Sequence, residues 1–341
     1  MHAFLLWSVC SVLSVNALRR TEVGSKSLSS ASSLLRSYPF YHSSDQISTL
    51  IENMDCAVPL AVHSESNIDV VDIGNPANLE KAFYLFGEHA RELISPETAL
   101  RLIEKLCSRT PSRMVVEALK TTHFRIIPNG NPVSRSLVEQ QGQTCLRLNE
   151  RGVDLNRNWD SHWKKNGDGN LDQVNPGAYA FSESETQLFR KAVVEFQPTV
   201  FATIHSGTRG MYMPWAFNAE SGVVVRNEKK MKSVLAELDA KFCQCPYGQA
   251  AAQVGYDSPG TCLDWVHEHT KTQFSYAFEI YTGIGEADLV RRYQEQLRGA
   301  SFLQESCFEQ FNPETQETYD DVVNNWADAL IQLAIMGTNG N

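Results

Sequence analysis

The chain has 341 residues, of which 42% are hydrophobic and 21% are charged, a composition that supports a large buried core and excludes a disordered protein. The 30 Lys and Arg residues are outnumbered by 40 Asp and Glu residues, which gives a net charge of −10 at pH 7. This charge opposes binding to nucleic acid or to anionic membranes, and we expect neither as a partner.

The N-terminal residues 1–17 are predicted to be a secretory signal peptide. An apolar stretch from Phe4 to Leu13 precedes Val15-Asn16-Ala17, where a signal peptidase reads small side chains, although the usual basic region is reduced to His2. The alternative is a buried N-terminal helix. No other apolar run reaches the roughly 20 residues of a membrane span. We therefore expect a secreted protein that does not insert into a membrane.

Strand-like and helix-like patterns alternate after a leader. Residues 18–37 are Ser-rich and lack periodicity, which indicates a flexible leader. Strands are predicted over 82–86, 123–127, 200–204 and 274–280, and helices over 96–106, 182–195, 228–242 and 319–336. A long polar loop is expected after residue 127, and Ser182 with Glu185 is predicted to form a capping box. We expect one α/β domain over 38–337, with a mixed, mostly parallel twisted sheet and helices on both faces, and a tail over 338–341.

Two of the predicted strands end in residues that bind metal ions. His89-Ala90-Arg91-Glu92 follows the strand over 82–86, and His205 follows the strand over 200–204. Residues three apart face the same side of a helical turn, and loops after the strands of an open α/β sheet form its ligand crevice. Two imidazoles and one carboxylate are the ligand set of a catalytic zinc site. An isolated His-x-x-Glu pair is more often a solvated ion pair, so the prediction depends on its context.

Further motifs supply that context. Three downstream segments are Gly152-Val153-Asp154-Leu155-Asn156-Arg157-Asn158-Trp159, Tyr256 with Asp264-Trp265, and Tyr276-Ala277-Phe278-Glu279. Taken in order with the two histidine segments, they resemble the carboxypeptidase A-like zinc carboxypeptidases from about residue 41 to about residue 335. The resemblance implies a zinc-carboxypeptidase fold and one Zn²⁺ ion per chain, held by His89, Glu92 and His205.

The resemblance also implies two catalytic residues. Glu279 matches the general base, and it interrupts an apolar strand near its end, where partial desolvation raises the pKa of a carboxylate. The alternative for Glu279 is a carboxylate that faces water at a sheet edge. Arg147, nine residues before Asn156, matches the arginine that stabilises the oxyanion. The competing arginines are Arg125, Arg135 and Arg151.

Five residues match the substrate-binding positions of the family. Asn156 and Arg157 match the clamp for the free α-carboxylate, for which a planar guanidinium is the best donor. Tyr256 matches the mobile tyrosine that closes over this carboxylate, and Arg91 matches an arginine that touches the extended substrate. Leu263 matches the base of the pocket, where an apolar residue favours apolar or aromatic C-terminal side chains.

The resemblance predicts a secreted, monomeric zinc carboxypeptidase that hydrolyses the last peptide bond of peptides or proteins. One alternative is a non-catalytic peptide-binding protein on the same fold, and another is a zinc amidase or endopeptidase.

The cysteines fit an oxidising compartment. Beyond the predicted signal peptide the chain has an odd number of cysteines, so at least one thiol is free, and the sequence leaves the disulfide pairing open. These cysteines are Cys56, Cys107, Cys145, Cys243, Cys245, Cys262 and Cys307. The polar segment 166–172 is predicted to be a surface turn, because its sixth residue, Leu171, is not the Gly that a calcium loop needs.

Overall fold

The computed structural model describes residues 33–165, 171–220, 222–285 and 307–338. The predicted signal peptide, residues 18–32 of the leader, residues 166–170 of the polar turn and most of the predicted tail lie outside the described residues. The last part of the predicted leader forms helix α1 (Ser33–Ser37), so the prediction that the leader reaches residue 37 is wrong. Leu34 and Leu35 pack against the main hydrophobic core, which explains why this segment is folded.

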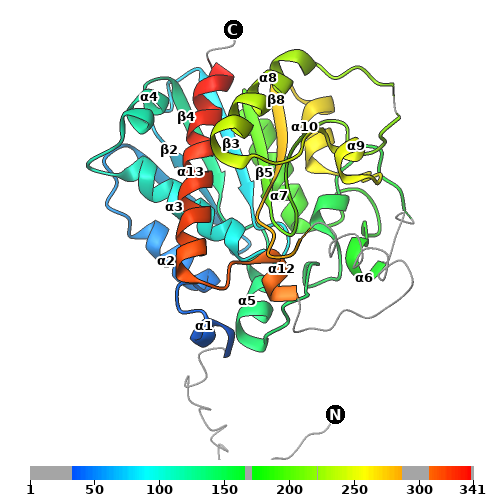
Figure 1. Ribbon diagram of the computed structural model, residues 1–341, viewed down its shortest axis with the longest axis horizontal. Helices are drawn as coiled ribbons and strands as arrows, with labels where there is room; N and C mark the ends of the chain where they lie inside the picture. The colour runs from blue at the N-terminus through cyan, green and yellow to red at the C-terminus, as the bar shows by residue number, and fades with distance from the viewer. Residues whose placement is uncertain (1–32, 166–170, 221, 286–306, 339–341) are drawn as a thin grey trace, which may run out of the picture. The chain divides into compact units, whose positions relative to one another are not determined.

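Within the described residues, eight strands form one mixed sheet (Figure 1). The strands are β1 (Leu60–Glu65), β2 (Ile68–Ile73), β3 (Glu80–Phe86), β4 (Thr122–Ile127), β5 (Val200–His205), β6 (Arg209–Met213), β7 (Tyr247–Gln249) and β8 (Phe274–Ile280). Their order across the sheet is β1-β2-β4-β3-β5-β8-β6-β7. The central strands β4, β3, β5 and β8 are parallel, whereas β1, β2 and β6 pair antiparallel with their neighbours β2, β4 and β8.

The central strands are apolar on both sides because helices cover both faces of the sheet. Tyr84 and Phe86 of β3 face one core cluster, and Phe83 and Leu85 face the other. The first cluster includes residues of α2 (Ser44–Glu52), α3 (Ile94–Cys107), α4 (Arg113–Thr121), α8 (Glu228–Leu238) and α13 (Gln316–Thr338). The second includes residues of α7 (Ser184–Phe196) and α10 (Cys262–His269). The predicted fold class is therefore confirmed, and a buried parallel core is why the central strands lack polar alternation.

Shorter elements connect these layers, and some differ from the predictions. They are α5 (Pro132–Gln141), the 3-10 turn η1 (Leu155–Arg157), α6 (Leu171–Val174), the π-helical turn η2 (Asp239–Cys243), α9 (Ala250–Val254) and α12 (Cys307–Phe311). Helix α5 lies where a long loop was expected, because its buried face is largely polar and gives no apolar period. The predicted capping box is also wrong, since α7 begins at Ser184 and the Ser182 hydroxyl donates to Glu183 instead.

The cysteine prediction agrees with the structure. Disulfides join Cys56 to Cys107, Cys145 to Cys307, and Cys243 to Cys245, and Cys262 is the free, buried thiol among the cysteines of the described residues. The second bridge ties the segment before Arg147 to α12, although these segments are 162 residues apart in the sequence.

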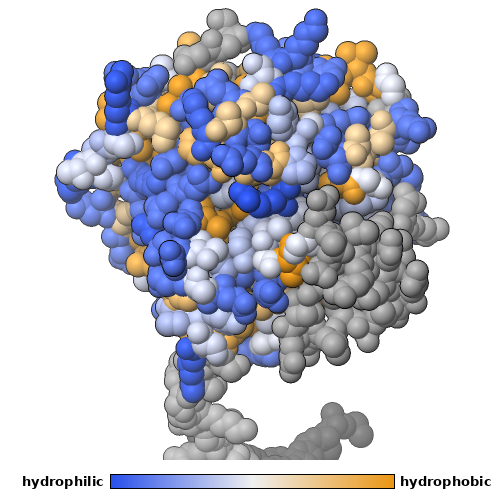
Figure 2. Space-filling view, in the orientation of Figure 1, coloured by the Kyte–Doolittle hydropathy of each residue, from blue (hydrophilic) through white to orange (hydrophobic). Residues whose placement is uncertain are grey.

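The surface matches the acidic, polar composition. On the face drawn in Figure 2, most residues are hydrophilic and the hydrophobic ones occur in small separate groups. None of the helices in the described ranges combines the length and the apolar character needed to cross a membrane.

A buried ionic network fixes the start of α3, the helix that follows the first predicted metal-binding motif. The Arg135 guanidinium donates to the Glu139 carboxylate at 2.7 Å, to the Glu97 carboxylate at 3.1 Å and to the Leu93 carbonyl at 2.9 Å. Glu97 also accepts the Tyr319 hydroxyl of α13 at 2.8 Å. Because all three charged side chains are at most 1% exposed, each charge depends on its partners for stability.

We predict that Arg135→Met lowers the free energy of unfolding by about 3–5 kcal/mol, because it removes the guanidinium that pairs with the buried carboxylates of Glu97 and Glu139. Urea titration of the purified protein measures the change. The matched control is Arg101→Met, which removes an exposed pair with Glu104 and should cost less than about 1 kcal/mol. Equal losses in the two variants would contradict this account of the network.

Candidate metal centre and active site

The candidate site lies at the carboxyl edge of the three central strands β3, β5 and β8. Phe86 of β3 pairs with Ile204 of β5, and His205 of β5 pairs with Glu279 of β8. His89 follows β3 by three residues, so its loop leaves the sheet beside the end of β5. This edge is where open α/β sheets bind ligands.

A glycine makes the tight turn after β3 possible. Gly87 has φ +69°, and a Cβ there would lie 2.8 Å from Pro96 Cγ and 3.0 Å from Asn129 Oδ1. The Ser95 hydroxyl accepts the Gly87 amide and donates to the Ile204 carbonyl at 2.7 Å. The turn, the start of α3 and the end of β5 are thus held together.

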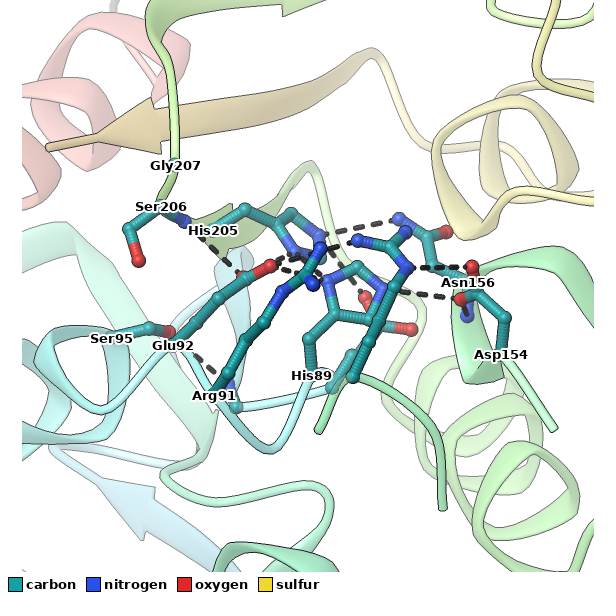
Figure 3. A network of polar contacts seen from close by, with 12 residues as sticks. His89, Arg91, Glu92, Ser95, Asp154, Asn156, His205, Ser206 and Gly207 are labelled. Atoms are coloured by element: carbon teal, nitrogen blue, oxygen red, sulfur yellow. Dashed lines mark hydrogen bonds and ion pairs between the residues drawn. The ribbon is translucent and has the colours of Figure 1, made fainter. Parts of the chain in front are cut away.

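His89, Glu92 and His205 converge in the structure. The two Nδ1 atoms are 3.1 Å apart, and Glu92 Oε1 lies 2.7 Å from His89 Nδ1 while Glu92 Oε2 lies 3.1 Å from His205 Nδ1. Figure 3 shows the three side chains pointing at one another. One ligand atom from each lies within 4.8 Å of the others, and all three residues are buried. Among the described residues, no other set of three such side chains meets this criterion.

The remaining imidazole nitrogens are held by neighbouring groups. His89 Nε2 contacts Asp154 Oδ1 at 3.1 Å, and His205 Nε2 contacts the Thr203 hydroxyl at 2.8 Å. This leaves both Nδ1 atoms directed at the shared centre beside Glu92. Two imidazole nitrogens and a carboxylate, with the outer nitrogens occupied, fit the requirements of a zinc ion. Asp154 lies inside the motif Gly152–Trp159, but the sequence does not predict its contact with His89.

The charges of the cluster are strongly coupled. Burial raises the pKa of Glu92, but the two adjacent imidazoles outweigh burial and hold that pKa well below its usual range. Burial lowers the pKa of His205, but hydrogen bonds to Glu88 and Glu92 outweigh it and raise this pKa to about 10. A cation that binds here must displace the His205 proton, so cation affinity rises with pH.

Glu279 lies beside this cluster, and one of its carboxylate oxygens makes no hydrogen bond within the described residues. This oxygen, Oε2, is buried. Burial, followed by repulsion from the Glu92 carboxylate, raises the pKa of Glu279 to about 7. This agrees with the expected desolvation of a carboxylate that interrupts an apolar strand. A carboxyl group with this pKa is suited to accept and return protons near neutral pH.

The structure places Arg147 at the cluster and the competing arginines elsewhere. Arg147 Nε donates to Asp154 Oδ2 at 2.9 Å, and its Nη1 lies 3.8 Å from Glu92 Oε1. Burial lowers the pKa of Arg147, but Asp154 and Glu92 outweigh it and raise the pKa, so the side chain stays charged. The competing arginines form ion pairs away from the site. Arg125 pairs with Asp72, Arg135 pairs with Glu97 and Glu139, and Arg151 pairs with Glu183.

The predicted carboxylate clamp lies next to the second histidine. Asn156 Nδ2 is 3.2 Å from His205 Nε2, and its Oδ1 accepts the Cys262 amide at 3.0 Å. Arg157 is half-buried and donates to the Ser258 hydroxyl at 3.1 Å and to the Asn156 carbonyl at 2.8 Å. Tyr256, two residues before Ser258, is 43% exposed, so its ring is not packed into the core.

Arg91 and Leu263 lie in different surroundings. The Arg91 guanidinium lies 4.1 Å from the centre of the Phe311 ring and donates to Gln173 Oε1 at 2.8 Å. Burial and the nearby charge of Arg147 lower its pKa to about 9. Leu263 is buried in a small apolar cluster with Tyr212, Ala216 and Ala250.

Comparisons with known proteins assign the family. A profile of the family described as zinc carboxypeptidase matches residues 63–319. The chain belongs to the zinc carboxypeptidase family. It is 24% identical over 260 residues to zinc carboxypeptidase A 1 of Anopheles gambiae, a match that covers 70% of this chain and 60% of that protein. It is also 24% identical over 211 residues to carboxypeptidase B of Astacus astacus, covering 57% of this chain and 68% of that protein.

Solved structures support the same fold. A crystal structure of thrombin activatable fibrinolysis inhibitor superimposes with a TM-score of 0.70 at 19% identity, covering 88% of this zinc carboxypeptidase family member and 75% of that chain. The family resemblance inferred from the sequence motifs is therefore confirmed. The chain spans about 60% of the length of the Anopheles gambiae relative.

We predict that Zn²⁺ stabilises this family member through the three converging side chains. Zinc at 100 times its Kd should raise the free energy of unfolding of the metal-free protein by about 2.7 kcal/mol, because the ion binds only the folded chain at this site. Unfolding measured with and without zinc tests this. The stabilisation should disappear in His205→Ala and persist in the control His63→Ala, which changes an exposed histidine on β1. Equal stabilisation of both variants would place the ion elsewhere.

Proposed function

We propose that this protein is a zinc-dependent carboxypeptidase that hydrolyses the C-terminal peptide bond of peptides or proteins. The observation that carries the proposal is the convergence of the His89, Glu92 and His205 side chains at one edge of the sheet. A carboxylate, Glu279, and two guanidinium groups, Arg147 and Arg157, come from three other segments to the same region. Family membership supports a peptidase, and the geometry supports the individual roles.

The catalytic roles follow from position and protonation state. Lewis acidity toward a carbonyl oxygen and toward water is what a zinc ion held by the three ligands would supply. Glu279 takes a proton from water at its unpartnered Oε2 and returns it to the leaving amine nitrogen. Arg147 remains charged and is fixed by Asp154, so it stabilises the negative charge that develops on the carbonyl oxygen.

Recognition of a free C-terminus follows from the clamp. Arg157 and Asn156 bind the terminal carboxylate, and the exposed Tyr256 ring closes over it. The apolar cluster around Leu263 favours apolar or aromatic terminal side chains. Arg91, held over Phe311, contacts the substrate further from its C-terminus.

The surroundings of the enzyme follow from its cysteines. The three disulfides of the described residues are typical of proteins that fold in an oxidising compartment, so we propose that the enzyme is secreted. We also propose that it is a monomer whose partners are its peptide substrates.

We predict that Glu279→Gln lowers kcat/KM for blocked dipeptides by at least about 10²-fold and leaves the zinc content unchanged. Glu279 acts as base only when ionised, so kcat/KM of the wild-type enzyme falls as pH drops through its pKa. That pKa is about 7 in the metal-free protein and is lower beside a bound cation, which stabilises the carboxylate. The acid limb of the pH profile should therefore lie below pH 7 and vanish in the variant.

The control for this experiment is Glu237→Gln, which changes an exposed glutamate on α8 and should keep the wild-type rate and pH profile. A Glu279→Gln enzyme with wild-type turnover would rule out the proposed base. Zinc-loaded wild-type protein that binds peptides tightly without cleaving them would favour the binding-protein alternative.

A second prediction concerns the carboxylate clamp. Arg157→Met should lower kcat/KM for peptides with a free C-terminus by roughly 10- to 150-fold, the equivalent of a lost hydrogen bond to a charged group. Peptides with an amidated C-terminus should be poor substrates of both proteins and show little change. If the wild-type enzyme cleaved free and amidated peptides equally well, the amidase or endopeptidase alternative would replace the proposal.

A further inference from the structure

A buried carboxylate next to the metal centre has no role in the proposed mechanism. Glu88 immediately precedes His89, is 1% exposed, and has no hydrogen-bond partner for Oε1 among the described residues. Its Oε2 atom accepts the Thr203 hydroxyl at 2.6 Å and the Cys262 thiol at 3.4 Å. A buried carboxylate with so few donors costs stability, so its presence beside His205 calls for an explanation.

We propose that Glu88 is a positioning residue that, through the Thr203 hydroxyl, orients the His205 imidazole so that its Nδ1 atom faces the metal centre. The inference rests on the metal site of the proposed function, and it concerns the ligand rather than the peptidase reaction. Thr203 lies two residues before His205 on β5, so both side chains are on the same face of the strand. The Thr203 hydroxyl is 2.8 Å from His205 Nε2.

The direction of these hydrogen bonds determines which nitrogen carries the proton. A carboxylate only accepts, and a threonine hydroxyl has one proton to donate. Thr203 donates that proton to Glu88, so toward His205 it can only accept. When His205 gives up one proton to bind a metal ion, the neutral ring must keep its remaining proton on Nε2, which leaves the lone pair of Nδ1 directed at His89 and Glu92. That is the form of the imidazole that binds a metal ion through Nδ1.

A competing donor makes this control necessary. Asn156 Nδ2 lies 3.2 Å from His205 Nε2, and its orientation is fixed because Asn156 Oδ1 accepts the Cys262 amide. An amide N–H at this position favours a lone pair on Nε2, which would put the proton on Nδ1 and block metal binding. The Glu88 carboxylate, acting through Thr203 and lying 3.4 Å from Nε2 itself, favours the opposite pattern. The charge-assisted bond to Glu88 fixes the Thr203 hydroxyl as an acceptor, and this hydroxyl lies nearer to His205 Nε2, at 2.8 Å, than Asn156 Nδ2 does, at 3.2 Å, so the pattern set by Glu88 prevails.

The two histidines thus use carboxylates in different ways. Asp154 contacts His89 Nε2 directly at 3.1 Å, whereas Glu88 reaches His205 chiefly through an intervening hydroxyl. Partners of this kind orient metal ligands, and their loss typically weakens metal affinity by about 10- to 100-fold.

The test measures zinc affinity rather than catalysis. The Kd for zinc is determined by competition with a chromophoric chelator at fixed pH for wild type, Thr203→Val, Thr203→Ser and Glu88→Gln. We expect Kd to rise about 10- to 100-fold in Thr203→Val, to rise in Glu88→Gln, and to stay within about 3-fold of wild type in Thr203→Ser, which keeps the hydroxyl. Thr98→Val, which changes a buried threonine whose hydroxyl donates to the Ile94 carbonyl, is the matched control and should bind zinc as the wild type does.

A double variant separates a relay from two unrelated packing effects. If Glu88 acts through Thr203, Glu88→Gln combined with Thr203→Val should weaken zinc binding no more than the larger single effect, whereas independent effects would add. Unfolding of the metal-free variants confirms that each protein is folded. Wild-type affinity in Thr203→Val, or equal losses in Thr203→Val and Thr203→Ser, would overturn the proposal. Zinc-binding differences without any peptidase activity would refute the proposed function and leave this inference standing, and a wild-type protein without a zinc site would refute both.

Discussion

The parallel pairing of β3, β5 and β8 is the constraint on which the site depends. Their paired ends bring His89 beside His205, although these residues are 116 positions apart in the sequence. Because both faces of these strands are buried, a shift of one residue would exchange the side chains of the two core clusters, and the register is strongly specified. The packing of the core therefore positions the polar groups at its edge.

Two carboxylates at this edge of the sheet have pKa values that are shifted in opposite directions. Glu92 lies between two imidazoles, which hold its pKa well below the usual range, whereas burial and the negative charge of Glu92 raise the pKa of Glu279 to about 7. One carboxylate is thus suited to bind a cation and the other to carry a proton. Pairs of acids whose surroundings move their pKa values apart are a common basis for acid–base catalysis.

Rigid and accessible parts of the site are divided between different elements. The predicted metal ligands are buried: His205 ends β5, and His89 and Glu92 lie in the loop between β3 and α3, which Arg135 holds through the Leu93 carbonyl and Glu97. Of the predicted substrate-binding residues, Arg157 is half-buried and Tyr256 is exposed. This division suits the proposed carboxypeptidase reaction, which needs exact ligand geometry together with access for a peptide end.

The fold class, the central strands and the residue types of the site could be inferred from the amino-acid pattern alone. Apolar runs reveal buried strands directly, and β8 occupies the predicted residues 274–280. The outer part of the fold was less predictable. Helix α5 buries polar side chains such as Arg135 and Glu139, whose burial depends on partners distant in the sequence. The pairing of the cysteines and the identity of the free thiol, Cys262, likewise depend on which segments meet.

Which arginine lies at the centre, and which groups contact the histidines, became clear from the folded chain. Arg125, Arg135, Arg147 and Arg151 have the same chemistry in the sequence, but Arg147 alone among them contacts Asp154 and Glu92. Glu88 and Thr203 carry no local signal of their relation to His205, because a hydrogen bond depends on distance and direction in space. Local patterns determine which residues are buried and which carry reactive groups, whereas the folded chain determines which of these groups meet.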